Sequence, residues 1–277
     1  MENRAQGAFE YILMLSGVLL VVITVVFMLQ GTTSNANNTL GQSRSTLDSL
    51  ITTSVKEAAE GDRPSSCLRL YNRGSKTSGN YTIYPRGLPI QAYCDMTTSG
   101  GGWTLVLLNS PYATPPKPGW ADATFGNSVT GTFGTDINGA FDQLVGVAYW
   151  NAIGNQLRVE VGASPTSISH RAYYSFYINE SKNYSLSMTS GTLDVGSTYP
   201  AMATYHAANN YQFTTIDSDH DASSSNCASN YGNTPWWYGS CWDGSFWGGG
   251  DSGSYQNRPY WTGSGSDYYA WGAIWIR

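Results

Sequence analysis

The sequence contains few charged residues. Asp, Glu, Lys and Arg make up 12% of its 277 residues, which is about half the share of an average soluble protein. The formal net charge is −5, and no stripe of Lys and Arg is available to bind a phosphate backbone, so nucleic acid is not an expected partner. Gly, Tyr and Trp are abundant instead, with 31, 20 and 10 residues. This composition is typical of extracellular proteins.

Catalytic motifs are also scarce. The three histidines, at positions 170, 206 and 220, are scattered along the chain, and no Ser or Cys nucleophile stands in a context such as G-x-S-x-G. The neighbouring carboxylates of Asp219 and Asp221 suit metal binding better than glycoside hydrolysis. We therefore expect that the protein is not an enzyme.

Only four cysteines occur, and all of them follow residue 60. None lies in a CxxC pattern that would indicate a zinc site, so an even number of cysteines predicts two disulfides formed in an oxidising compartment. Four cysteines allow three pairings, and the spacing alone does not choose among them.

A long apolar run lies near the N-terminus. Residues 11–29 contain nineteen residues without a charge, which at roughly 1.5 Å per residue is about enough for a helix to cross a bilayer. A secretory signal peptide or a simple membrane anchor is one interpretation. However, no A-x-A cleavage site follows the run, and Glu10 stands at its start, where a carboxylate costs free energy unless it is paired.

Residues 4–11, RAQGAFEY, resemble the processing site of archaeal type IV pilins. The resemblance implies that a membrane-bound aspartic prepilin peptidase cuts between Ala5 and Gln6 and removes residues 1–5 as a leader. Glu10 then becomes the fifth residue of the mature chain, where the pilin glutamate pairs with the N-terminal amine of a neighbouring subunit. Archaellins usually lack this glutamate, so the resemblance favours a pilus over an archaellum.

Residues 6–61 are predicted to form the assembly helix, which spans the membrane before assembly. The stretch 31–41 is rich in Gly, Asn, Ser and Thr, which are poor helix formers, so we expect a kink there. Apolar residues then recur at spacings of three, four and seven up to Val55, as in an amphipathic helix. The cluster GDRP at 61–64 ends the helix and marks a domain boundary.

Residues 62–277 read as short alternating strands separated by Gly and Pro, which predicts a β-rich domain. Several motifs in this part resemble fibrinogen C-terminal domains, and the last residues are similar to those of intelectins. The resemblance implies an α+β, β-rich globular fold with disulfides Cys67–Cys94 and Cys227–Cys241. The motifs that carry it are SC at 66–67, GNYTIYP at 79–85, YCDMTT at 93–98, GGGWT at 100–104, LRVE at 157–160, NYSL at 183–186, FTTID at 213–217, NCA at 226–228, WWY at 236–238 and WGAIWIR at 271–277.

An acidic loop precedes the third cysteine and places carboxylates at the alternate positions 217, 219 and 221. A flexible loop rich in oxygen atoms suits calcium, although a solvated acidic turn explains the same pattern. Fibrinogen-like domains carry a calcium loop at this position. The resemblance maps the ligands to the side chains of Asp219 and Asp221 and to the carbonyls of Ser223 and Ser225.

The same resemblance places a recognition pocket beside the second disulfide and a cis peptide bond, here Ser240–Cys241. Aromatic faces next to polar groups suit sugar rings or acetyl groups. The candidate pocket residues are Tyr231, Trp237, Ser240, Cys241 and Trp242. We expect one of Trp236 and Trp237 to belong to the core. Trp242 stands where family members often have a histidine, and the segment between the cysteines is one residue longer, so the ligand stays open.

Four asparagines begin N-x-[ST] sequons, and we expect some of them to carry glycans on an outer surface. They are Asn37, Asn80, Asn179 and Asn183.

Together these features predict a structural subunit of an extracellular type IV-like, archaeal pilus. Its N-terminal helix forms a homo-oligomeric helical filament after insertion in the cytoplasmic membrane, and its fibrinogen-like head binds glycans or acetyl groups with calcium. The alternative is a membrane-anchored, calcium-dependent lectin that does not polymerise. The mature N-terminus separates the two, since only a pilin begins at Gln6.

Overall fold

The computed structural model of the protein describes part of the chain. The chain divides into two compact units, Met1–Gly61 and Asp62–Arg277, and every described residue lies in the second. The predicted helix at 6–61, the processing site, Glu10 and Asn37 lie outside the described residues. No helix among the residues described is long and apolar enough to cross a membrane. The described ranges are 63–110, 117–131, 137, 141–189, 191–196, 208–241, 259–262 and 266–277.

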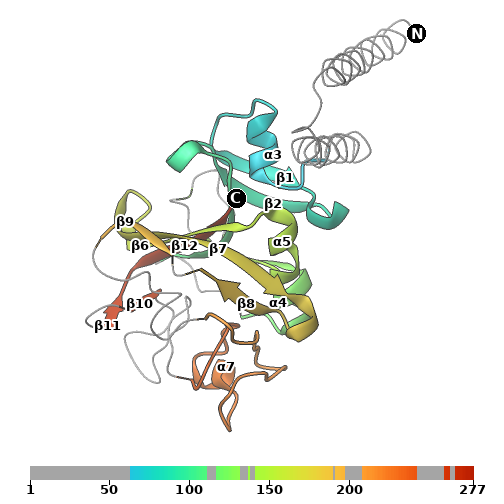
Figure 1. The fold of residues 1–277 in the computed structure, drawn as a ribbon, viewed down its shortest axis with the longest axis vertical. Helices are drawn as coiled ribbons and strands as arrows, with labels where there is room; N and C mark the ends of the chain where they lie inside the picture. The colour runs from blue at the N-terminus through green and yellow to red at the C-terminus, as the bar shows by residue number, and fades with distance from the viewer. Residues whose placement is uncertain are drawn as a thin grey trace, which may run out of the picture. The chain divides into compact units, whose positions relative to one another are not determined.

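A ten-stranded antiparallel sheet forms the centre of the second unit (Figure 1). Seven strands follow one path: β1 (Gly79–Ile83), β2 (Ile90–Asp95), β3 (Trp103–Asn109), β12 (Trp271–Ile276), β6 (Gln156–Ser164), β7 (Ser167–Asn179) and β8 (Ser185–Met188). The hairpin of β4 (Asn127–Gly131) and β5 (Phe141–Val145) joins at β3, and β9 (Thr192–Val195) pairs with β7. A separate hairpin contains β10 (Tyr260–Thr262) and β11 (Ser266–Tyr268).

The described helices are short, which agrees with the predicted β-rich fold. They are α3 (Cys67–Asn72), α4 (Trp120–Phe125), α5 (Trp150–Ile153) and α7 (Cys227–Asn230), with 3-10 turns at Pro85–Gly87, Thr98–Gly100, Val147–Tyr149 and Glu180–Lys182. Two of the helices begin at polar caps. The Ser66 hydroxyl accepts from the backbone N–H of Arg69 at 3.4 Å, and the Asn226 side chain accepts from that of Ser229 at 2.9 Å. Such caps fix where the chain turns into a helix.

Both predicted disulfides are present. Cys67–Cys94 joins α3 to β2 with its Cα atoms 5.5 Å apart, and Cys227–Cys241 joins α7 to the segment after residue 236 with its Cα atoms 4.9 Å apart. The pairing that the family resemblance implied is therefore confirmed.

The main core lies on one face of the sheet, because side chains alternate between the two faces along each strand. Ile274 and Ile276 of β12 point to this face, where they join a large cluster of buried aromatic rings. Trp150 and Trp237 are among its largest fully buried side chains, and their ring centroids are 5.3 Å apart. Burial of such large rings supplies much of the hydrophobic stabilisation of this unit.

The opposite face of the sheet carries a buried cation between two indole rings. The Arg158 Cζ atom lies 4.9 Å from the Trp103 ring centroid and 4.6 Å from that of Trp275. Its Nη2 atom donates to the carboxylate of Asp95 at 2.7 Å. A guanidinium that is 1% exposed needs such partners, because an isolated buried charge costs several kcal/mol.

A second ion-pair group extends this face towards β9. Glu160 accepts from Nε of Arg171 at 2.5 Å and from the indole N–H of Trp275 at 2.8 Å. Arg171 also donates to Asp194 at 3.2 Å. Arg158 and Arg171 are thus both paired with carboxylates.

Candidate functional site

The acidic loop is fastened to the domain at its first carboxylate. Asp217 Oδ1 accepts from the backbone N–H of Trp120 at 2.8 Å and from the Thr215 hydroxyl at 2.7 Å. The hydrogen bond from Thr215, together with the Trp120 N–H, lowers the pKa of Asp217 although burial opposes the change. A Cβ atom at Gly119 would lie 2.7 Å from Asp217 Oδ2, so a side chain at residue 119 would displace this carboxylate. Asp217 therefore holds the loop against α4.

His220 provides a second anchor for the loop. Its backbone N–H donates to the Thr214 hydroxyl at 3.0 Å, and its ring nitrogens lie 2.9 Å from Ser218 Oγ and 3.2 Å from Asn183 Nδ2. Its ring centroid is 5.0 Å from that of Trp120. From the sequence, His220 was considered only as a catalytic residue, because nothing in a single sequence shows that residue 220 packs beside residues 120 and 183.

Asp219 and Asp221 lie next to each other in the anchored loop. Asp221 accepts from the backbone N–H groups of Ser223 and Cys227, both at 2.8 Å, and its own N–H donates to Asp219 Oδ1 at 3.3 Å. Burial raises the pKa of Asp221; the two N–H groups oppose this, and the Asp219 charge adds to it. A bound cation would reduce the repulsion between these two carboxylates.

Two carbonyls complete the oxygen set that the sequence predicted. Among the described residues, the Ser223 carbonyl accepts no hydrogen bond, and the Ser225 carbonyl has one polar contact, with the disulfide sulfur of Cys241 at 3.7 Å. Both carbonyls therefore keep lone pairs for another ligand. The loop offers hard oxygen donors from side chains and backbone, as calcium prefers.

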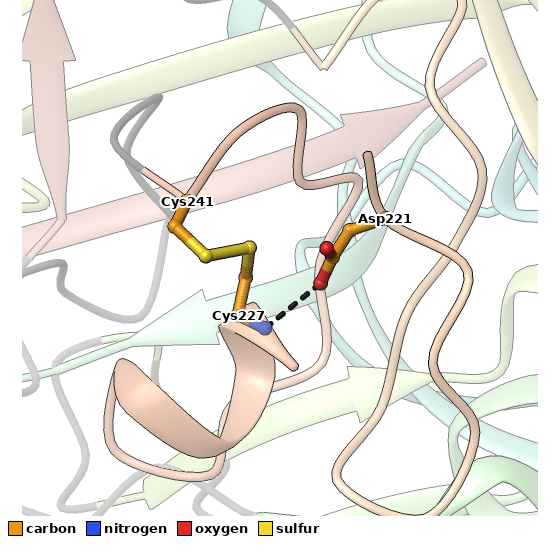
Figure 2. A group of neighbouring side chains, drawn as sticks. All are labelled: Asp221, Cys227 and Cys241. Carbon is orange, nitrogen blue, oxygen red and sulfur yellow. Dashed lines mark hydrogen bonds between the residues drawn. A yellow bond between two sulfur atoms is a disulfide. The ribbon is translucent and has the colours of Figure 1, made fainter. Parts of the chain in front are cut away.

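A different metal cluster is ruled out by the disulfide. Side-chain ligand atoms of Asp221, Cys227 and Cys241 all lie within 4.8 Å of one another, but the two sulfurs are bonded to each other (Figure 2). No thiolate is therefore present to bind a soft metal. Instead Figure 2 shows Asp221 directed at the backbone nitrogen of Cys227, which ties the acidic loop to the start of α7.

Three of the predicted pocket residues lie around the second disulfide. The Tyr231 N–H donates to the Cys227 carbonyl at the end of α7, and the Tyr231 ring centroid is 6.2 Å from that of Tyr238. Ser240 is exposed and Cys241 is partly buried. Trp242 lies outside the described residues.

Trp237 does not fit a ligand pocket. It is 1% exposed, its indole N–H donates to the Tyr184 carbonyl at 2.7 Å, and its ring centroid lies 4.9 Å from that of Phe213. Trp236 is also buried, at 4% exposure. We predicted that one of the two tryptophans belongs to the core. In the structure both do, because the main core extends beneath this segment.

The predicted cis peptide bond at Ser240–Cys241 is also wrong. The described residues contain no cis peptide bond, and Cys241 instead adopts a left-handed backbone with φ of 71°. A trans bond between two residues other than proline is favoured by about 3 kcal/mol. The left-handed region is sparsely populated by residues other than glycine.

Three predicted sequons lie in the described part of the chain. Asn80 is in β1, Asn179 ends β7, and Asn183 has a left-handed φ of 47°. The Asn183 amide donates to Gln212 at 2.7 Å and faces His220, so a glycan there would disturb the loop anchor. Among the described residues, the Asn179 side chain has a hydrogen bond only from Ser181, which makes Asn179 the better glycan acceptor. Glycosylation stays a prediction.

Comparison with known proteins places this geometry in a family. Residues 63–277 match the family described as fibrinogen beta and gamma chains, C-terminal globular domain. The chain belongs to this family. Techylectin-5A of Tachypleus tridentatus is 27% identical over 249 residues, which cover 80% of this chain and 81% of that protein. Ficolin-3 of Homo sapiens is 29% identical over 65% of this chain and 57% of its own length.

Solved fibrinogen-like domains have the same fold. The fibrinogen-like globe domain of human ANGPTL2 superposes with a TM-score of 0.59 and 27% identity, over 77% of this chain and 98% of that one. The fibrinogen-like globe domain of human ANGPTL6 gives a TM-score of 0.59 and 25% identity, over 77% of this chain and 95% of that one. The resemblance that the motifs carried is confirmed for the whole described unit.

The N-terminal segment matches a second family. Residues 3–29 match the class III signal peptide, the type of signal that type IV pilins carry. This match covers Ala5, Gln6 and Glu10. The chain thus joins a pilin-type signal to a fibrinogen-like domain, and this combination indicates an exported protein with a surface-exposed recognition head.

Proposed function

We propose that this chain is a structural subunit of an extracellular type IV-like pilus of the archaeal kind, with its fibrinogen-like head exposed for adhesion. The observation that carries the proposal is the joining of a class III signal at residues 3–29 to a fibrinogen-like domain at 63–277 in one chain. A signal of this class leaves its apolar run on the mature protein. The same run then serves as a membrane anchor and later as the assembly helix.

Glu10 distinguishes an assembly helix from a simple anchor in this proposal. It stands immediately before the apolar run of residues 11–29, where a carboxylate needs a partner. Cleavage before Gln6 creates a positively charged amine, and in a filament the amine of one subunit pairs with Glu10 of the next. A lone membrane anchor offers no such partner.

The mature N-terminus and one substitution test the assembly role. Mass spectrometry should find a chain that begins at Gln6, and Glu10→Ala should insert in the membrane but form few filaments by electron microscopy. Glu57→Ala, which removes another carboxylate of residues 6–61, is the matched control and should assemble normally. A chain that begins at Met1, or normal filaments from the Glu10 variant, would favour the membrane-anchored lectin.

For the head we propose calcium-supported recognition of glycans or acetylated groups beside the Cys227–Cys241 disulfide. The support is a loop in which Asp219 Oδ1 accepts from the Asp221 N–H, and in which the carbonyls of Ser223 and Ser225 accept from no N–H group of the described residues. A further support is that relatives include a protein named as a lectin, Techylectin-5A. The bound cation would hold the loop that carries Ser240 and Cys241.

Calcium binding has a direct thermodynamic test. A ligand that binds only the folded chain stabilises it by about 2.7 kcal/mol when its concentration is about 100 times Kd. Calcium should therefore raise the melting temperature of the parent relative to chelator, whereas Asp219→Ala combined with Asp221→Ala should abolish the difference. Asp122→Ala, at an exposed carboxylate of α4, is the control and should retain it. A parent whose melting temperature ignores chelator has no calcium site.

A further inference from the structure

A cavity lies away from the acidic loop. It has a volume of about 500 Å³ and opens where β7 turns from pairing with β9 to pairing with β8. Its lining includes Ser99, Trp103, Gln156, Tyr173, Thr192 and Arg277. The chain's C-terminus, beside this cavity, lies well apart from α7 in Figure 1. Clefts of this size hold small molecules such as one or two sugar rings.

The walls of the cavity are fixed by contacts between distant segments. The Tyr173 hydroxyl lies 2.5 Å from Ser99 Oγ and also donates to Asp194 at 3.3 Å. The backbone of Arg277 exchanges hydrogen bonds with that of Gln156, each 2.9 Å long. The cleft is therefore held in shape without a ligand, which lowers the entropic cost of binding.

The positive charge at the cavity is not neutralised. Arg158 pairs with Asp95 and Arg171 pairs with Glu160 and Asp194, but Arg277 forms no ion pair with any described residue. Its Nη1 atom donates only to the Ser99 carbonyl, at 3.3 Å. The remaining guanidinium N–H groups are available to an anion, and a guanidinium fork matches a carboxylate closely.

A buried donor at the same cavity also lacks a partner. Trp103 lines the cavity and is 2% exposed, and its indole N–H has no hydrogen-bond partner among the described residues. A buried N–H without an acceptor costs free energy comparable to a lost hydrogen bond. The indole nitrogen exposes less than 1 Å², so a ligand oxygen that removes this cost must first displace a neighbouring side chain of the cavity wall. The Arg277 Cζ atom lies 5.8 Å from the Trp103 ring centroid, so donor and cation are close together.

We propose that this cavity is a second ligand site, separate from the acidic loop, which binds a small acidic sugar through its carboxylate. Arg277 pairs with the carboxylate of a uronic acid, and the indole N–H of Trp103 donates to a ligand oxygen. The hydroxyls of Tyr173 and Thr192 and the amide of Gln156 line the remaining wall, where sugar hydroxyls find polar partners. The Asp194 carboxylate, which accepts from the Tyr173 hydroxyl at 3.3 Å, is paired with Arg171 and is not among the lining residues.

Calorimetric titration of the purified full-length chain with sodium glucuronate, in the presence of chelator, tests the proposal. The parent should bind glucuronate in a saturable way and bind glucose more weakly. Arg277→Gln should raise Kd by about tenfold or more, because it removes a charged hydrogen bond. Tyr173→Phe should weaken binding less. Arg73→Gln, at an exposed arginine outside the cavity, is the matched control and should bind like the parent.

Three results would overturn the proposal. They are an absence of saturable glucuronate binding to the parent, equal binding by Arg277→Gln and the parent, and binding that disappears when chelator is added. The last result would place the ligand at the acidic loop instead. A thermal melt of each variant shows whether it is folded, and Arg277→Lys, which keeps the charge but not the fork, should bind between the parent and the glutamine variant.

Discussion

Replacing Asp95 by Asn should destabilise the fibrinogen-like unit by about 3 kcal/mol at neutral pH. Asp95 Oδ1 accepts from the N–H groups of Thr97 and Thr98, both at 3.0 Å, while Oδ2 receives the buried Arg158. Burial alone would raise the pKa of Asp95, but Arg158 and the two N–H groups lower it from 3.8 to about 2. This shift corresponds to roughly 2.5 kcal/mol of stability, and the asparagine also leaves Arg158 without its nearest counter-ion.

Urea unfolding of the full-length chain between pH 2 and pH 7 measures this effect. A carboxyl whose folded pKa is lowered contributes its full stability above about pH 4, and the contribution is lost as the pH falls towards about 2. The difference between the parent and Asp95→Asn should therefore shrink over that range. Asp194→Asn is the control: its side chain is 48% exposed in its ion pair with Arg171, so it should cost less than about 1 kcal/mol. A difference that is small at pH 7, or constant with pH, would refute the reasoning.

Three further changes separate other roles. Asp142 accepts from the Ser110 N–H, but burial raises its pKa to about 6. The free energy of unfolding should therefore fall as the pH rises from about 4 to about 6, because the folded chain keeps a proton that the unfolded chain releases. Asp142→Asn should raise the free energy of unfolding by roughly 3 kcal/mol at pH 7 in the same urea assay. Trp237→Leu should cost about 3 kcal/mol, with glycan affinity unchanged in binding assays of the folded protein. Changing Cys227 and Cys241 to Ser should cost about 3 kcal/mol and weaken the stabilisation by calcium in thermal melts.

Motifs with fixed spacing were predictable from the sequence. The segments around Cys94 and Cys227 carried the family, and with it the pairing of all four cysteines. The alternation of Asp219 and Asp221 with other residues is also visible in the sequence itself, while calcium binding by this pair stays a prediction. These features are local, so a single sequence displays them.

Features that depend on contacts between distant segments were not predictable. Trp237 and Tyr231 both looked like pocket residues, and only the packing of Phe213 and Trp150 shows that Trp237 is core. His220 gave no signal as an anchor, since two of the residues that it contacts, Trp120 and Asn183, are far away in the chain. The backbone at Cys241 was assigned by analogy with the family, and the structure replaces that analogy with a left-handed residue.

The position of β12 determines when this unit can fold. It is the last strand in the sequence, yet it lies between β3 and β6 in the middle of the sheet. Until residues 271–276 have emerged, the strands β1–β3 and β6–β8 have no strand to join them. Pairing across such sequence separations is slow because loop closure precedes the gain from contacts. During export, the sheet can therefore close only where residues 271–276 and the strands β3 and β6 are present together.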